Sequence, residues 1–171
     1  VWRMLAEAEL AAPGSPAPDC GAEATALRKT THKTIAGVTS EIEGFAFNKA
    51  VARLYEYVNA IGRATGQGAD LAFARREAFE TLARLMAPMT PHFAEECWSA
   101  LGGSRMLVET PWPEADAELA RDDTVSLPVQ VNGKKRAEVE VAADAPREEV
   151  ERMALAEPAG AKFLDGAAPK K

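Results

Sequence analysis

The chain has 171 residues, of which 47% are hydrophobic, and it carries a formal net charge of −6 at pH 7. This length allows one hydrophobic core, or one core with a small appended domain. No apolar run reaches the roughly 18 residues of a membrane-spanning helix, and the first residues, Val1–Met4, lack the pattern of a signal peptide. We therefore expect a soluble, cytoplasmic protein without a membrane partner.

The two cysteines, Cys20 and Cys97, match neither the spacing of metal ligands nor a secreted disulfide framework. We expect free thiols, no metal site, and Cys97 in the core. The charge is uneven along the chain. Residues 22–66 hold six basic and four acidic residues, whereas residues 95–123 hold eight acidic and two basic residues. A local basic surface is therefore compatible with the acidic total.

The first twenty residues are expected to be the end of a helix whose beginning is missing, followed by a loop rich in Pro and Gly. A helical bundle is expected over residues 21–103. Its first helix, residues 22–43, places Leu27, Thr31, Thr34, Ile35, Val38 and Ile42 on one face, with Gly44 at its end.

The next helix, residues 46–64, has the clearest apolar period. Its predicted core stripe consists of Phe47, Ala50, Val51, Leu54, Tyr55, Val58 and Ile61. A turn at residues 66–68 leads to a helix that begins near Asp70. That helix should bury Leu71, Ala74, Ala78, Phe79, Leu82, Leu85 and Met86.

A helix break follows, in the stretch L-M-A-P-M-T-P-H-F-A-E-E-C-W from Leu85 to Trp98. Pro88 disfavours helix before it, Thr90 is placed to cap the next helix, and Pro91 suits its first position. We predict a helix over residues 91–101. Short loops between long amphipathic helices imply antiparallel neighbours and hence a bundle.

The periodicity changes after Ser104. Residues 104–123 are expected to form an extended, Pro-rich, acidic connector in which Trp112 pins the chain to the bundle. Residues 124–171 are expected to form a small α+β domain with a β-hairpin and a helix over residues 146–156, which half-buries Val150, Met153 and Leu155. The predicted fold is therefore mainly α, a bundle followed by this small domain.

The register of the hairpin follows from its turn. A two-residue Asn132-Gly133 loop would place Val129 opposite Arg136. We instead predict a three-residue loop of Val131, Asn132 and a left-handed Gly133, which pairs apolar residues with one another from Leu127 onward. The predicted pairs are Val129 with Lys135, Leu127 with Ala137, and Val125 with Val139.

Three stretches carry a family resemblance: the helix break, L-R-K-T-T-H-K-T-I at Leu27–Ile35, and V-Q-V-N-G-K-K-R-A at Val129–Ala137. A break followed by P-H-x-x-E-E-x-W resembles the C-terminal helical domain of class I aminoacyl-tRNA synthetases. The ordered set is similar to the bacterial leucyl-tRNA synthetase family over the whole chain. The resemblance implies an anticodon-binding-type bundle and a last domain truncated before one further strand. It also implies docking on leucine tRNA through backbone and shape contacts, beside the rest of the synthetase chain.

The residues show no catalytic constellation, so the chain itself should not form an aminoacyl-adenylate. The resemblance places ATP and Mg²⁺ in a catalytic domain outside these residues and implies no cofactor within them. It makes Pro88, Thr90, Pro91, His92 and Trp98 a structural motif. We expect His92 to orient the start of its helix by a hydrogen bond, and Glu95 and Glu96 to favour the helix dipole.

Basic residues at helical spacing are the candidates for RNA binding. On the first long helix these are Arg28, Lys29, His32 and Lys33, and on the second Lys49 and Arg53 with Tyr57. The hairpin adds Lys134, Lys135 and Arg136. Solvated helix faces and edge-strand protection are the competing interpretations. Two other functions stay open: the same region of a valyl- or isoleucyl-tRNA synthetase, and a non-enzymatic helical protein-interaction module.

Overall fold

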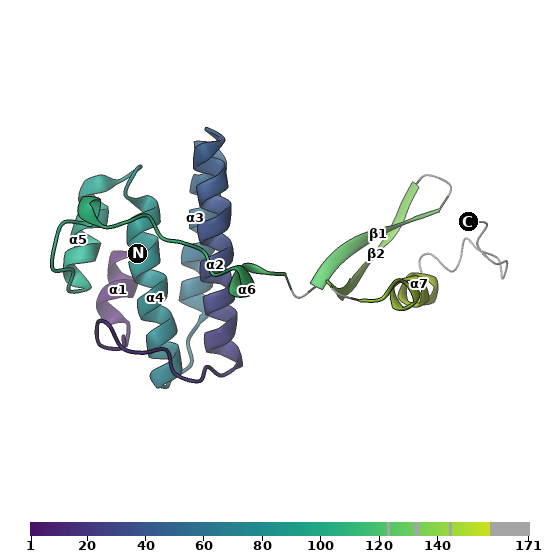
Figure 1. Cartoon of the computed structure of the whole chain (residues 1–171), viewed down its shortest axis with the longest axis horizontal. Coiled ribbons are helices and arrows are strands. Elements are labelled where there is room, and N and C mark those ends of the chain that lie inside the picture. The colour runs from purple at the N-terminus through teal and green to yellow at the C-terminus, as the bar shows by residue number, and fades with distance from the viewer. Residues whose placement is uncertain (123, 132–133, 144, 158–171) are drawn as a thin grey trace. The chain divides into compact units, whose positions relative to one another are not determined.

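The computed structural model describes residues 1–122, 124–131, 134–143 and 145–157 (Figure 1). Its contacts divide the chain into two compact units, Val1–Arg121 and Asp122–Lys171, which are considered separately. No helix among the described residues is long and apolar enough to cross a membrane.

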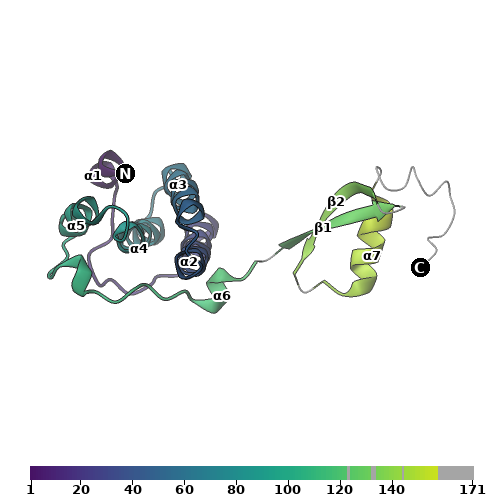
Figure 2. The ribbon, with the colours of Figure 1, turned by 90° about the horizontal axis from the view of Figure 1, so that it is seen from above.

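The first unit is a helical bundle. Its helices are α1 (Trp2–Glu7), α2 (Ala22–Glu43), α3 (Phe47–Arg63), α4 (Ala69–Met86) and α5 (Pro91–Ala100). The helix α2 packs against both α3 and α4, and α4 also packs against α5. Seen from above, α4 lies between the α2–α3 pair and α5, with α1 on the side opposite the segment that leads to α6 (Figure 2). The predicted antiparallel bundle is confirmed.

The core lies between α2, α3 and α4. The predicted faces of α2 and α4 are confirmed, since every predicted residue is buried except Ile42, which is half-buried. The stripe predicted on α3 is partly wrong. The residues that α3 buries are Ala50, Leu54, Tyr57 and Ile61, whereas Phe47, Val51 and Tyr55 are exposed. The packed face of α3 is thus turned away from much of its most apolar stripe.

The helix break is confirmed in position. Helix α4 ends at Met86, Thr90 is the N-cap of α5, and Pro91 is its first residue. The Thr90 hydroxyl does not cap α5, however; it donates to the carbonyl oxygen of Met86 at 3.2 Å. The break is therefore made by the prolines and by Thr90 closing the end of α4.

Residues 104–121 cross one side of the bundle, and we call this segment the strap. It contains two short helical elements, η1 (Leu107–Glu109) and α6 (Ala117–Ala120), so the prediction of a wholly extended connector is wrong. Helix α6 forms because the Asp116 carboxylate accepts from the backbone N–H groups of Glu118 and Leu119. The predicted pin is confirmed: Trp112 Nε1 donates to Thr39 Oγ1 on α2 at 2.8 Å.

The second unit contains the antiparallel strands β1 (Thr124–Val131) and β2 (Lys134–Ala142) and the helix α7 (Arg147–Ala156), which packs against β2. The predicted hairpin and helix are confirmed. Leu155 of α7 is 45% exposed, contrary to the prediction, while Val150 and Met153 are half-buried. The turn residues Asn132 and Gly133, and residues 158–171 at the end of the predicted truncated domain, lie outside the described residues.

The predicted register is wrong. Val131 pairs with Lys134, as in a two-residue turn, and a bulge follows between Val129 and Gln130, so that Arg136 is the extra residue. The resulting apolar pairs are Val129 with Ala137, Leu127 with Val139, and Val125 with Val141. The bulge shifts the pairing by one residue in the direction opposite to that of the predicted longer loop, and either shift restores apolar contact on one face because side chains alternate along a strand.

Candidate nucleic-acid interface

Arg28 and His32, predicted to face RNA, are held instead by Glu77 of α4. The Glu77 carboxylate accepts from Arg28 Nε at 2.9 Å and Arg28 Nη2 at 3.2 Å, and it lies 3.4 Å from His32 Nε2. Burial raises the pKa of Glu77, but the hydrogen bonds from His32 and Arg28 outweigh it, and the pKa is lowered overall. This cluster joins α2 to α4.

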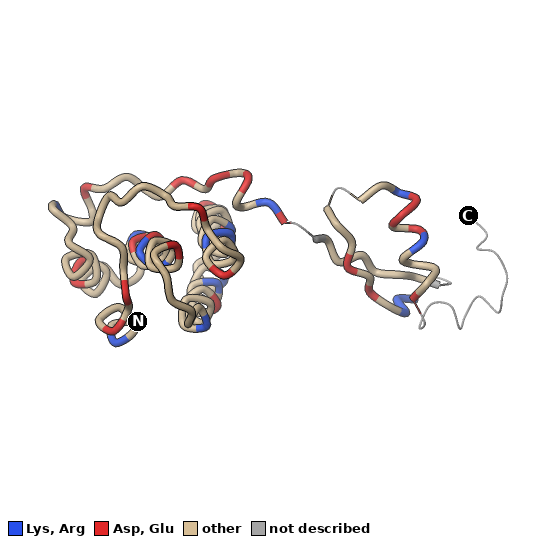
Figure 3. The backbone as a smooth tube through the Cα atoms, turned by 90° about the horizontal axis from the view of Figure 1, so that it is seen from below, with Lys and Arg blue, Asp and Glu red and all other residues tan. Residues whose placement is uncertain are grey.

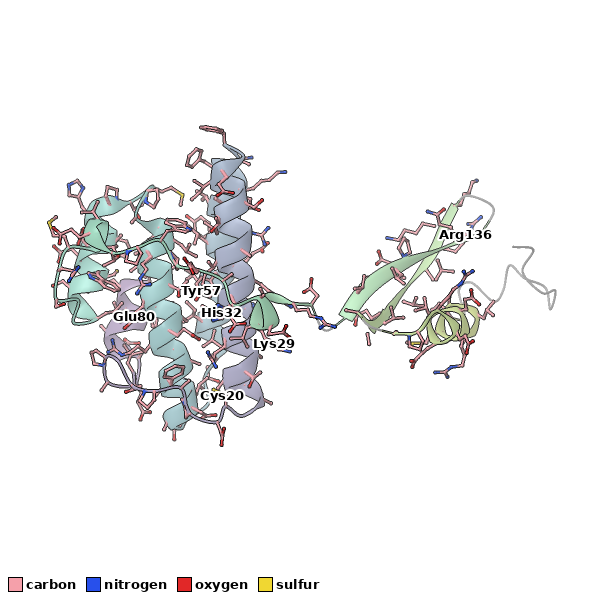
Figure 4. All side chains as sticks on the ribbon, viewed as in Figure 1. Cys20, Lys29, His32, Tyr57, Glu80 and Arg136 are labelled. Carbon is pink, nitrogen blue, oxygen red and sulfur yellow. The ribbon has the colours of Figure 1, made fainter. Side chains whose placement is uncertain are left out.

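The strap completes the environment of His32. The backbone N–H of Asp116 donates to His32 Nδ1 at 3.0 Å, and His32 is only 9% exposed. Both ring nitrogens therefore have partners, and the ring lies inside the unit (Figure 4). The placement of His32 on an exposed basic strip is wrong, because the strap covers it.

Tyr57 is also in the core. It is 0% exposed, and its hydroxyl lies 2.8 Å from Thr31 Oγ1 and 3.1 Å from the carbonyl oxygen of Ala78. Burial raises the pKa of this phenol. The prediction that Tyr57 shares an exposed strip with Lys49 and Arg53 is therefore wrong, because Tyr57 faces α2 and α4.

Arg53 is partly exposed but paired. Its guanidinium donates to both carboxylate oxygens of Glu41, at 2.7 Å for Nη2 and 3.2 Å for Nε. The side chain crosses α2 at Gly37, where an added Cβ would lie 2.5 Å from Arg53 Nε. The absence of a side chain at Gly37 thus lets the Arg53 side chain pack closely against α2, and the hydrogen bonds to Glu41 hold the guanidinium in that position.

The remaining basic residues of α2 and α3 share one outer surface. Lys49, Arg53 and Arg63 of α3 fall within about 80° of one another around the helix axis, at about 100° per residue. Arg63 lies beside Thr30 of α2, and Arg53 beside Gly37. Lys33 is one turn from each of those α2 positions. We call Lys33, Lys49, Arg53 and Arg63 the outer α2–α3 face.

This face is mixed rather than purely basic. Lys49 and Arg63 are exposed, Lys29 and Lys33 are half-buried, and Glu56 lies among the same residues of α3. Figure 3 shows basic residues along α2 and α3 and mainly acidic ones along the strap. Arg63 was missed in the sequence analysis, although its helical spacing from Lys49 would have placed it on this face.

The hairpin cluster is exposed in the second unit. Lys134, Lys135 and Arg136 are all exposed, and Lys135 forms an ion pair with Glu138 on the same strand. Arg136 is the extra residue of the bulge and lies toward the turn end of the hairpin (Figure 4). Bulges re-aim side chains next to functional sites. The three cationic side chains of this cluster are therefore at the surface of the second unit.

Of the structural motif, Trp98 makes the contacts of an anchoring residue and His92 does not. Trp98 Nε1 donates to the carbonyl oxygen of Arg105 at 3.0 Å, and the Arg84 guanidinium lies 5.2 Å from the Trp98 ring centre. Trp98 thus anchors the start of the strap. The His92 side chain is exposed and makes no hydrogen bond to any described residue, so the predicted orienting bond is wrong.

Glu95 has a role that the sequence analysis missed. Its carboxylate accepts from the backbone N–H groups of Leu107 at 2.8 Å and Val108 at 3.2 Å. The Glu95 carboxylate therefore binds the backbone of the strap at η1, in addition to any favourable interaction with the dipole of its own helix. No local signal predicts this contact, because the partners are twelve and thirteen residues away.

The thiols are as predicted: Cys97 is buried, Cys20 is half-buried, and neither forms a disulfide. Among the described residues, no group of three or more His, Cys, Asp or Glu side chains is arranged to hold a metal ion. The outer α2–α3 face thus combines exposed Lys49 and Arg63 with half-buried Lys33 and Arg53 on the helical bundle.

Comparison with known proteins identifies the family. Residues 24–152 match the family described as the anticodon-binding domain of tRNA ligase. The chain belongs to this family. The chain is 49% identical over all 171 residues to a leucine–tRNA ligase of Dinoroseobacter shibae, of which it covers 19%. It is 52% identical over 171 residues to that of Cereibacter sphaeroides strain ATCC 17025 and 52% identical over 155 residues to that of Caulobacter vibrioides NA1000.

A solved structure is also similar. The ternary complex of Agrobacterium radiobacter K84 agnB2 LeuRS with tRNA and LeuAMS matches the chain with a TM-score of 0.76 and 27% identity. The match covers 99% of this chain and 21% of that one. The chain thus spans about a fifth of the length of its relatives.

Proposed function

We propose that this chain is the tRNA-docking part of a bacterial leucine–tRNA ligase, which joins leucine to its tRNA at the expense of ATP in the cytoplasm. The observation that carries the proposal is the similarity over the full chain, 49% identity across 171 residues to such a ligase. The likeness to a LeuRS solved with tRNA supports tRNA as the partner. In this proposal ATP and Mg²⁺ bind in parts of the ligase outside these residues.

The outer α2–α3 face is the proposed docking surface of the bundle. Lys49 and Arg63 are exposed at its two ends, and Arg53 lies between them. Fourteen helical residues span about 21 Å, which matches several phosphates along an RNA strand. We expect contacts to the backbone rather than to base edges, because such contacts position a nucleic acid without reading its sequence.

The hairpin cluster is the proposed second contact. The side chains of Lys134 and Arg136 are positively charged and exposed, and neither residue belongs to the described core. Two weak basic surfaces on one chain raise the affinity for a single RNA when both can engage it. The rest of the ligase supplies further contacts in this proposal.

The alternative functions receive less support. The three similar ligases named above are leucine enzymes rather than valine or isoleucine enzymes. The acidic side chains Glu109, Glu114 and Glu118 of the strap are exposed, so a protein-interaction module that uses its acidic connector is sterically allowed, but the similar proteins named above are tRNA ligases.

The test is a titration of the chain with leucine and valine tRNAs at 50 and 200 mM salt. Three phosphate contacts would weaken binding roughly 40-fold over this range. We expect a steep salt response and tighter binding of the leucine tRNA. Binding that does not respond to salt would contradict phosphate docking, and tighter binding of the valine tRNA would contradict the leucine assignment. Leucine charging by the longer protein tests the activity itself.

A further inference from the structure

The hydrogen bond between the strap and His32 depends on the protonation state of the imidazole. The backbone N–H of Asp116 donates to His32 Nδ1 at 3.0 Å, and His32 Nε2 lies 3.4 Å from Glu77 Oε1. A neutral imidazole keeps one acceptor nitrogen, whereas a protonated imidazole donates from both nitrogens. Protonation of His32 would therefore place two N–H donors opposite each other, and the bond to Asp116 would be lost.

The ring is the fixed partner of this bond, and the strap is the freer one. His32 is only 9% exposed, and its Nε2 faces Glu77 of α4. Asp116 and the residues on either side of it, 114–118, are all exposed. Helix α6 has only four residues, so it has little stability of its own and depends on its packing against α2. When the bond breaks, the strap is therefore the part that moves.

The charged groups around His32 come from three elements. They are Arg28 on α2, Arg76, Glu77, Glu80 and Arg84 on α4, and Glu114 and Asp116 on the strap. Arg28 opposes a second positive charge, but the Glu77 carboxylate that accepts from Arg28 also faces His32 Nε2. Arg76 is paired with Glu80. The sum of these charges is acidic, which favours uptake of a proton by the ring.

We propose that His32 is a proton-operated latch, in which protonation of the ring releases α6 from α2. Imidazole is the side chain that changes its charge between about pH 5 and pH 8. The latch is therefore closed at the alkaline end of this range and open at the acidic end. The bond from Trp112 to Thr39 involves no group that titrates in this range, so the strap stays attached there.

The latch changes the length of chain that tethers the second unit. With α6 docked, residues 121–123 connect α6 to β1. With α6 released, the free connection is residues 113–123, which adds about 26 Å of extended chain at about 3.3 Å per residue. A longer tether lowers the effective concentration of the second unit at any site that the bundle also binds. The inference does not depend on which partner that is.

The experiment follows the Asp116 amide and both histidine rings of the 171-residue chain by NMR between pH 8 and pH 5. Hydrogen exchange of residues 113–121 is measured over the same range and corrected for the intrinsic effect of pH on exchange. His32→Asn keeps an acceptor oxygen near the position of Nδ1 but does not titrate. His92→Asn, at the exposed position of the other histidine, is the matched control.

We expect the Asp116 amide signal to shift with the same midpoint as the His32 ring. The protection of residues 113–121, relative to α4, should fall at least tenfold by pH 5 in the wild type and in His92→Asn, and less than twofold in His32→Asn. If His32→Asn lacks this protection already at pH 8, the two midpoints in the wild type decide.

Three results would overturn the inference. The first is a His32 ring that stays neutral down to pH 5, and the second is an Asp116 amide that does not respond while His32 titrates. The third is an equal loss of protection in His32→Asn, which would assign the pH response to the carboxylates of Glu77, Glu114 or Asp116. No tRNA is present, so the result is independent of the tRNA titration.

Discussion

The backbone amide of Asp116 donates to His32 Nδ1 at 3.0 Å and joins two residues that are 84 positions apart. Because Nδ1 accepts this bond, a neutral His32 carries its proton on Nε2, which faces Glu77. The strap, α2 and α4 therefore meet at one largely buried polar cluster. Residues with the composition of an RNA-binding strip serve here to hold the domain together.

Replacing Glu77 with glutamine should lower the free energy of unfolding by about 2 kcal/mol at pH 7, because Arg28 loses its partner. Because the pKa of Glu77 is lowered in the folded chain, the free energy of unfolding also depends on pH. A carboxylate with a lowered folded-state pKa stabilises fully above its ordinary value of 4.5 and loses this effect as the pH falls through the folded value.

Denaturant unfolding at pH 7 and pH 4 measures both effects. The wild-type chain should lose more stability than Glu77→Gln between these values. Glu43→Gln, at an exposed position of α2, is the control and should follow the wild type. An equal pH response of Glu77→Gln and the wild type would contradict the role of the cluster.

Tyr57→Phe should destabilise the domain by about 1 to 2 kcal/mol, since its hydroxyl is buried against Thr31 and Ala78. Tyr55→Phe, at a position that is 70% exposed, should change the stability by less than about 0.5 kcal/mol. Thermal unfolding of the two variants provides the comparison. The reverse order would restore the sequence-based assignment of Tyr55 to the core.

These two tyrosines show where sequence reasoning reached its limit. On α2 and α4 nearly all of the predicted apolar stripe is buried within the unit, so the buried faces of those helices were predictable. On α3 the apolar stripe is broader than the face that packs, and periodicity does not tell which part is covered within the unit. The same applies to the hairpin, where a bulge and a longer loop shift the register in opposite directions but place the same apolar residues on one face.

The candidate site was predictable only in part. Exposed Lys49 and the hairpin residues Lys134 and Arg136 lie where charge and spacing placed them. The pairing of Arg28 with Glu77 joins residues 49 positions apart, and no local pattern contains that information. Basic residues at helical spacing therefore have to be checked against distant carboxylates before they are assigned to RNA.

Glu41→Gln should increase the affinity for tRNA, by about two- to fivefold at low salt, because it releases Arg53 from a bidentate pair. Glu43→Gln makes the same change of net charge on the same helix without releasing a cation. Filter binding or fluorescence titration of both variants separates the two effects. Equal gains would show that net charge alone is responsible.

Reversing the charge of Lys134 and Arg136 in the longer ligase should raise the KM for tRNA about fivefold or more while leaving the KM for leucine unchanged. Reversal of Arg147 and Arg152 on α7, which are exposed and paired with neighbouring glutamates, is the matched control. Steady-state aminoacylation kinetics of the two double variants give the KM for tRNA and the KM for leucine in each. A KM for tRNA that rises equally in both double variants would remove the hairpin from the proposed contact.

The measurement that tests the central claim most directly is tRNA binding by Lys49→Glu/Arg63→Glu across a range of salt concentrations. The control, Arg3→Glu/Arg105→Glu, carries the same charge change at exposed positions off the outer α2–α3 face. We predict that the first variant binds at least tenfold more weakly, with a salt slope smaller by about two, and that the control retains most of the affinity. Equal loss in the two variants would contradict docking of tRNA on the outer α2–α3 face.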